Sequence, residues 1–248
     1  MEELTSKPRK RRRSNIQLDG DVMQALEELV CQYGFGNVNI TALMKHAGIE
    51  ANVFYKRYGS MDKLYAMLAK QYDFWLNDTV EISSLHTMGP KMFFAETLKK
   101  LYSELSGNEI MQKLLLWELT SDNETTRQSA QMRDLLNLSL VTFYEKMFKP
   151  AQINIKGIVA ALISGIYYLT LHKERAEFCA IDFSTPEGKK CFFDAIDSLA
   201  DILFDRLEVR KEKREIALRM VADGLTEANI CKYLAVNKKD LRALCANP

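Results

Sequence analysis

One short segment of the chain carries side chains that can recognise a nucleic acid. Asn52, Tyr55, Lys56 and Arg57 lie within eight residues that read as a single helix, Ala51 to Tyr58. An asparagine amide can pair bidentately with adenine, which is worth about 1–3 kcal/mol of discrimination between bases. Lysine, arginine and tyrosine side chains suit phosphate oxygens. The segment therefore predicts base reading at Asn52 and backbone contacts at Tyr55, Lys56 and Arg57.

The residues before this segment predict the element that positions it. Four apolar residues recur at three- and four-residue spacing and predict a short helix after Asn39, a suitable N-cap: Ile40, Leu43, Met44 and Ala47. Gly48 permits the left-handed backbone of a tight turn before Ala51 begins the second helix. The pattern is typical of a helix-turn-helix, which presents the outer side of its second helix to the major groove.

Neighbouring positions complete the predicted contact surface. Ala51 faces outward beside Asn52, and Val53 lies at the edge of that face. Thr41 stands near the first free N–H groups of the preceding helix, where a hydroxyl can donate to a phosphate. Tyr58 is expected in the core, and a third helix is predicted from Met61 to about Val80.

Over residues 15–80 the sequence resembles the DNA-binding domain of the tetracycline-repressor (TetR) family of transcriptional regulators. The matching residues are Leu43, Ala47, Gly48, Ile49, Tyr55, Tyr58, Gly59, Ser60, Met61, Asp62 and Leu64. Met44, Glu50 and Met61 depart from the family's usual residue types. The resemblance implies a dimeric repressor, released from a palindromic operator in double-stranded DNA by a small effector, and it also implies a phosphate contact for Tyr55.

The charge distribution fits a polyanionic partner at the ends of the chain. Residues 1–70 carry 11 Lys or Arg and 8 Asp or Glu, residues 71–208 carry 14 and 20, and residues 209–248 carry 9 and 5. Arg11, Arg12 and Arg13 close a basic run over residues 1–14, which is disordered alone. This run is either a DNA-binding arm or a solvated tail. The predicted helix-turn-helix, the reader of DNA, follows directly and favours the arm.

Composition gives no indication of catalysis, of a cofactor or of a membrane. The sequence has no glycine-rich phosphate loop, no nucleophile beside a base and no HExxH motif, and its five cysteines and three histidines lack metal-ligand spacing. The most apolar stretch, residues 158–171, is shorter than the roughly 20 residues of a membrane span. We expect a cytoplasmic protein that is not an enzyme and holds neither metal nor cofactor.

Residues 81–208 are predicted to form a helical regulatory and dimerisation domain. Its expected helices are Lys91 to Ser106, Glu109 to Leu119, Thr125 to Phe148, Ile153 to Ala176 and Pro186 to Glu208. In the family that the sequence resembles, the last two helices form a four-helix interface between subunits. The corresponding candidates here are Gly157, Ala161, Gly165, Phe192, Ile196, Leu199 and Leu203. The alternative is that both helices belong to the core of one subunit.

The same region is rich in aromatic residues that could line a pocket for a small apolar or aromatic effector. The candidates are Phe94, Tyr102, Met111, Trp117, Phe143, Tyr144 and Tyr168. Aromatic residues at helical spacing are more often plain core, so this pocket is an expectation that depends on the resemblance.

Residues 209–248 extend beyond the family plan. Glu212 to Asp223, Glu227 to Leu234 and Lys238 to Cys245 are predicted as short helices that resemble a degenerate helix-turn-helix. The whole chain is thus predicted to be all-α. The preferred hypothesis is a dimeric, effector-released DNA-binding repressor, and the alternative is a helical protein-interaction module with a weakened reader that acts through its basic C-terminal extension.

Overall fold

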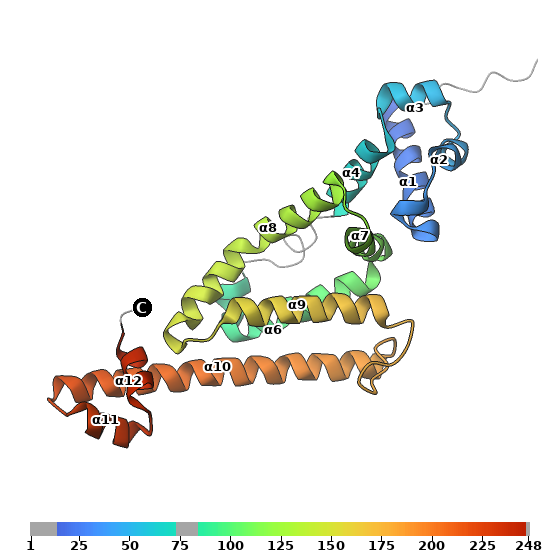
Figure 1. The fold of residues 1–248 in the computed structure, drawn as a ribbon. Coiled ribbons are helices and arrows are strands. Elements are labelled where there is room, and N and C mark those ends of the chain that lie inside the picture. The colour runs from blue at the N-terminus through green and yellow to red at the C-terminus, as the bar shows by residue number, and fades with distance from the viewer. Residues whose placement is uncertain (1–13, 73–83, 247–248) are drawn as a thin grey trace, which may run out of the picture. The chain divides into compact units, whose positions relative to one another are not determined.

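The computed structural model of the chain describes residues 14–72 and 84–246. This part of the chain is built from α-helices and short 3-10 helices and contains no strand, which confirms the predicted all-α fold (Figure 1). The elements are α1 (Asn15–Tyr33), η1 (Phe35–Asn37), α2 (Ile40–Ala47), α3 (Ala51–Arg57), α4 (Met61–Tyr72), α6 (Ser84–Gly107), α7 (Glu109–Thr120), α8 (Glu124–Phe148), η2 (Lys149–Ala151), α9 (Ile155–His172), α10 (Pro186–Ala222), α11 (Glu227–Leu234) and α12 (Lys238–Cys245).

The helices divide into two compact units. Within the described residues, unit 1 comprises 14–72 with 109–130, and unit 2 comprises 84–108 with 131–246. The sequence-based division assigns residues 109–130 to the regulatory domain, whereas α7 packs with α1, η1 and α4. Helix α8 begins in unit 1 and continues in unit 2.

The aromatic residues of unit 1 explain why α7 belongs to it. The rings of Trp117 and Phe35 stack with centroids 4.7 Å apart, and Tyr65 meets the Trp117 ring edge-on at 5.3 Å. The Tyr65 hydroxyl donates to the carbonyl of Val38 at 3.1 Å. Such a cluster contributes specific ring geometry in addition to buried apolar area, so it fixes α7 against the helix-turn-helix segment.

Unit 2 is a bundle in which α6 packs on both α9 and α10. Its core combines residues of α6, α8, α9 and α10, among them Phe94, Tyr144, Ile166 and Phe204. Gly89 has a φ of 76° and interrupts α6 with a kink just before Pro90. Helical residues precede this kink from Ser84, so α6 begins before the start that the sequence predicts at Lys91.

Helix α10 is longer than the sequence predicts. It runs without interruption for 37 residues from Pro186 to Ala222, so the predicted end at Glu208 and the predicted new start at Glu212 are both wrong. A hydrogen-bonded ion pair between Lys211 and Glu208 crosses the supposed break at 2.8 Å. Pairs three residues apart favour helix on an exposed face, which explains why the charged run continues the helix.

The structure describes only the first part of one predicted helix. The predicted helix from Met61 to Val80 is α4 as far as Tyr72, and its remainder lies outside the described residues.

Among the residues that are described, α9 is long and apolar enough to cross a membrane by length and composition alone. Ile155 and Ile166 of α9 nevertheless lie in the core of unit 2.

Candidate nucleic-acid interface

The predicted helix-turn-helix forms in unit 1, and its first helix, α2, is capped at both ends. The Asn39 side chain accepts from the Ala42 N–H at 2.8 Å and begins α2. Gly48 ends α2 in the left-handed conformation, with φ 61° and ψ 47°, and the Ile49 N–H donates to the Met44 carbonyl at 3.0 Å. These bonds satisfy groups that a helix end otherwise leaves open, so the turn geometry fixes where α3 begins.

Helix α3 has one buried side and one exposed side. Phe54 is fully buried and Tyr58 is 5% exposed, so these two residues, four positions apart, anchor the helix in the core. The predicted contact residues on α3 are all exposed: Ala51, Asn52, Val53, Tyr55, Lys56 and Arg57. The sequence reasoning missed Phe54, although its four-residue spacing from Tyr58 was the available signal.

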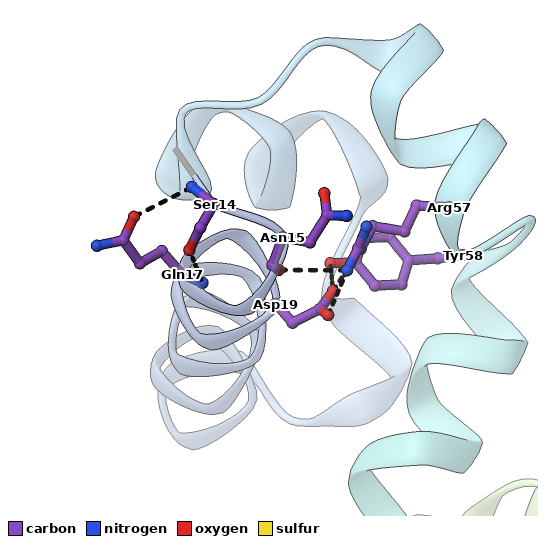
Figure 2. A network of polar contacts seen from close by, with 6 residues as sticks. All are labelled: Ser14, Asn15, Gln17, Asp19, Arg57 and Tyr58. Carbon is purple, nitrogen blue, oxygen red and sulfur yellow. Dashed lines mark hydrogen bonds and ion pairs between the residues drawn. The ribbon is translucent and has the colours of Figure 1, made fainter. Parts of the chain in front are cut away.

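Arg57 is held by a polar network at the start of α1 (Figure 2). Its guanidinium donates through Nε and Nη2 to the two carboxylate oxygens of Asp19, each at 2.5 Å. Nη2 also donates to the carbonyl of Asn15 at 3.2 Å, and the Tyr58 hydroxyl donates to Asp19 Oδ1 at 2.7 Å. Ser14 and Gln17 close a capping box at the start of α1, so the network rests on a well-formed helix end.

The network shifts the protonation of its members in the directions expected for a hydrogen-bonded ion pair. The guanidinium of Arg57, followed by the Tyr58 hydroxyl, holds the pKa of Asp19 below its ordinary value. Burial, with the neighbouring carboxylate, raises the pKa of Tyr58 to about 12. Asp19 is therefore ionised and Tyr58 protonated near neutral pH, which is the state in which each bond is made.

The outward cations of α3 consequently differ in what they can do. The Nε and Nη2 donors of Arg57 face Asp19 and Asn15, whereas Lys56 lies on the exposed side of the helix. Arg57 therefore holds α3 against α1, whereas the phosphate contacts of Lys56 and Tyr55 stay predictions. The sequence alone gave both cations the same role, because residue spacing does not reveal a partner 38 positions away.

A concave surface lies beside the exposed side of α3. It is lined by Asn15, Leu18, Gly48, Ile49, Glu50, Asn52, Val53, Lys56 and Arg57. Thr41 is exposed in the first turn of α2. Glu50 is the N-cap residue of α3 and is exposed, but its side chain makes no capping hydrogen bond. The arm residues Arg11, Arg12 and Arg13 lie outside the described residues.

The predicted effector residues do not form one set. Met111 and Trp117 belong to unit 1, while the other five candidates belong to unit 2: Phe94, Tyr102, Phe143, Tyr144 and Tyr168. Trp117 is 8% exposed in the aromatic cluster described above, and Tyr168 is 49% exposed. Met111 and Trp117 are thus core residues of unit 1.

Two of the candidates line a small apolar cavity in unit 2. The cavity measures about 50 Å³ and is lined by Phe94, Thr97, Leu98, Leu101, Asn137, Leu140, Val141, Tyr144, Val159 and Ile163. The Tyr144 hydroxyl donates to the Pro90 carbonyl at 2.9 Å, beside the kink of α6. Ligand pockets commonly measure about 300–1,000 Å³, so a drug-sized molecule would require these helices to separate.

The predicted dimer residues divide between surface and core. Gly157 and Ala161 are exposed on α9, Gly165 and Phe192 are half-buried, and Leu199 is 40% exposed on α10. Ile196 and Leu203 are buried in the core of unit 2, where they pack within one chain. Ile202, one residue before Leu203 on α10, is 63% exposed.

No protein-family model matches the sequence, and no curated protein matches it. The solved structures that are similar to the chain include the following two. GusR of Salmonella enterica has a TM-score of 0.56 and 9% identity, covering 77% of this chain and 97% of its own. The fatty acid degradation regulator FadR of Bacillus halodurans has a TM-score of 0.53 and 11% identity, covering 77% of this chain and 96% of its own. At these identities the similarity is one of fold. It extends over nearly the whole of GusR and of FadR and over 77% of this chain.

Proposed function

We propose that the chain is a sequence-specific, DNA-binding transcriptional regulator of the tetracycline-repressor type, acting as a cytoplasmic homodimer. The observation that carries this proposal is the helix-turn-helix of unit 1, with Asn52, Tyr55 and Lys56 exposed on one helix that Phe54 and Tyr58 anchor from behind. The similarity of fold to the regulator FadR supports it. In the proposed complex Asn52 reads a base edge, and Lys56 and Tyr55 contact phosphates.

A palindromic operator is proposed because a helix-turn-helix dimer reads half-sites about 34–36 Å apart. The proposed dimer face combines exposed small residues of α9 with exposed apolar residues of α10. It consists of Gly157, Ala160, Ala161, Ser164, Leu199 and Ile202. Small residues let two helix backbones approach closely, and burial of Leu199 and Ile202 supplies apolar area.

The proposed effector site is the apolar cavity of unit 2. Its polar side chains are Asn137, Thr97 and Tyr144. The Thr97 hydroxyl already donates to the Phe93 carbonyl at 2.7 Å, and the Tyr144 hydroxyl donates to the Pro90 carbonyl. A small apolar or aromatic ligand would enlarge the cavity, and we propose that this releases the repressor from its operator. By linkage, the operator must weaken effector binding by the same factor.

The function is tested by selecting bound sequences from a pool of random duplexes with the purified full-length chain. We expect an inverted repeat with half-sites one helical turn apart, and a stoichiometry of two chains per duplex in analytical ultracentrifugation. Enrichment of no sequence would contradict the proposal. It would favour the protein-interaction alternative, in which exposed Glu50 beside the reader has weakened DNA binding.

The dimer face is tested separately by the double variant Leu199→Asp/Ile202→Asp. The expected result is a monomer that loses affinity for the full operator more than for a single half-site. The matched control is Leu135→Asp/Leu138→Asp, which changes two exposed leucines of α8 at the same three-residue spacing. A dimer that survives in the first double variant would remove α10 from the interface.

A further inference from the structure

The C-terminal end of the chain repeats the backbone of the helix-turn-helix residue by residue. Helices α2 and α11 have eight residues each, and each ends at a residue in the left-handed conformation. Gly48 has φ 61° and ψ 47°, and Ala235, at the corresponding position, has φ 50° and ψ 50°. The second helix begins three positions after each left-handed residue, α3 at Ala51 and α12 at Lys238.

The hydrogen bonds of the two turns correspond as well. The Ile49 N–H donates to the Met44 carbonyl at 3.0 Å, and the Val236 N–H donates to the Cys231 carbonyl at 3.1 Å. In each case the acceptor is the fifth residue of the first helix. Each first helix also begins with a side-chain cap that accepts from the third residue after it: Asn39 from Ala42 at 2.8 Å, and Thr226 from Asn229 at 3.3 Å.

The buried positions follow the same correspondence. Leu43, Ala47 and Phe54 are buried in the first helix-turn-helix. Ile230, Leu234 and Leu241 stand at the matching positions and are at most 8% exposed. The C-terminal set packs with fully buried Ala217 of α10 in a core of its own. The unit therefore has the inner face of a helix-turn-helix as well as its turn.

The outer face of α12 carries cations where α3 carries the proposed reader. Lys238, Lys239 and Arg242 occupy the positions of Ala51, Asn52 and Tyr55, and all three are exposed. Arg242 pairs with Glu227 at 3.0 Å, but its side chain is 74% exposed. An exposed ion pair of this kind contributes little to stability, so a phosphate can replace the carboxylate.

The one acid in the first turn of α12 is turned toward the helix cap. The Asn237 side chain donates through Nδ2 to the Asp240 carboxylate at 2.8 Å, and its Oδ1 accepts from the Asp240 N–H at 2.8 Å. Residues 209–248 as a whole carry 9 Lys or Arg against 5 Asp or Glu. The charge of the unit and of its outer face thus complements a polyanion.

We propose that α11 and α12 form a second DNA-binding helix-turn-helix, distinct from the reader in unit 1. Lys238 and Lys239 contact the phosphates of a duplex from the first turn of α12, and Arg242 contacts them one turn later. Leu244 is buried where α3 has Arg57, so binding is concentrated in the first half of α12. A chain with two such units can hold two segments of DNA at once.

The first experiment isolates the second unit inside the full-length protein. A background variant, Asn52→Ala/Lys56→Ala, disables the reader in unit 1, and duplex binding that remains is measured by fluorescence anisotropy at several salt concentrations. Adding Lys238→Ala/Lys239→Ala should weaken that binding at least tenfold and reduce the salt slope by about 1.8, because each phosphate contact contributes about 0.9. The control adds Lys189→Ala/Lys190→Ala, another exposed lysine pair, on α10.

The second experiment tests whether one protein holds two duplexes. A biotinylated duplex on beads is saturated with protein carrying an intact reader, and capture of a second, fluorescent duplex is measured. Capture should be lost in Lys238→Ala/Lys239→Ala and kept in Lys189→Ala/Lys190→Ala. The proposal would be overturned if Lys238→Ala/Lys239→Ala left the salt slope of the background variant unchanged and the second duplex were still captured. The unit would then be a protein-binding appendage. Failure of the reader in unit 1 would instead appear as loss of sequence selection, so the two failures are distinguishable.

Discussion

The guanidinium of Arg57 and the carboxylate of Asp19 form a bidentate ion pair, with both N–O distances at 2.5 Å. The pair joins the last residue of α3 to the first turns of α1, across 38 positions of sequence. Because a bidentate pair fixes direction as well as distance, it holds the end of α3 against α1. The positions of Asn52 and Lys56 therefore depend on two residues that need not contact DNA.

Removing this carboxylate should destabilise unit 1 in a graded way. Asp19→Asn keeps an acceptor for the Tyr58 hydroxyl and should cost less than about 1 kcal/mol, as expected for an exposed ion pair. Asp19→Ala removes that acceptor from the part-buried hydroxyl and should cost about 1–3 kcal/mol. Urea denaturation followed by circular dichroism measures both. Equal stability of the two variants would show that the Tyr58 hydrogen bond contributes nothing.

The contribution of Asp19 should also depend on pH. Its pKa is lower in the folded protein than the ordinary value of 3.8, because Arg57 and Tyr58 stabilise the charged form. The stability that it contributes is therefore fully present above that ordinary value and is lost as the pH falls through the folded pKa. We expect the difference in unfolding free energy between the wild-type protein and Asp19→Asn to be constant from neutral pH to about pH 5 and to shrink in stronger acid. Denaturation at a series of pH values tests this, and a difference that grows in acid would contradict it.

Two substitutions on α3 should separate base reading from phosphate binding. Asn52→Ala should relax discrimination at one base pair of each half-site, by about 1–3 kcal/mol, and leave other positions unchanged. Lys56→Ala should weaken binding to all duplexes alike and reduce the salt slope by about 1. Competition binding against single-base operator variants measures both effects. If Asn52→Ala weakens every duplex equally, Asn52 does not read a base.

Gly188 should be the least replaceable glycine among those described. A Cβ added there would lie 1.9 Å from the carbonyl oxygen of Asp182, so Gly188→Ala must displace the backbone before α10. Overpacking of this kind costs about 1–3 kcal/mol or more. Gly20→Ala on α1 is the control, since nothing lies within 4 Å of its added Cβ, and it should stabilise by about 0.5–1 kcal/mol. The melting temperature measured by thermal denaturation should therefore fall for Gly188→Ala and rise for Gly20→Ala.

The sequence predicted the helices better than it predicted their partners. Apolar spacing and Gly48 located the helix-turn-helix, because a tight turn of this kind depends on local residues alone. Trp117 reads equally well as part of an effector pocket or of a core, and only the stack with Phe35 at 4.7 Å decides between them. Helical spacing identifies the buried side of a helix but not the helix that covers it.

The candidate site shows the same division between local and long-range information. The exposure of Asn52 and Lys56 on α3 follows from a period of 3.6 residues, and the structure places both outside. The role of Arg57 could not be predicted, because its partner Asp19 lies on another helix. The length of α10 was also missed, since a charged run is typical of both a solvated helix and a link between helices.

Because helix α10 is uninterrupted, its length sets the direction in which the C-terminal unit faces about the helix axis. Its 37 residues run from Pro186 to Ala222. They include Leu199 and Ile202 and, near the end of the helix, Ala217, which packs with α11 and α12. Each residue of an α-helix adds about 1.5 Å of length and 100° of rotation. One alanine inserted after Glu208 would therefore turn the C-terminal unit by about 100° relative to the α10 face that carries Leu199, while seven would nearly restore its direction about 10 Å farther away. If both ends of α10 engage partners together, the direction in which α12 points is set by the number of residues between them, and evolution can change it one residue at a time.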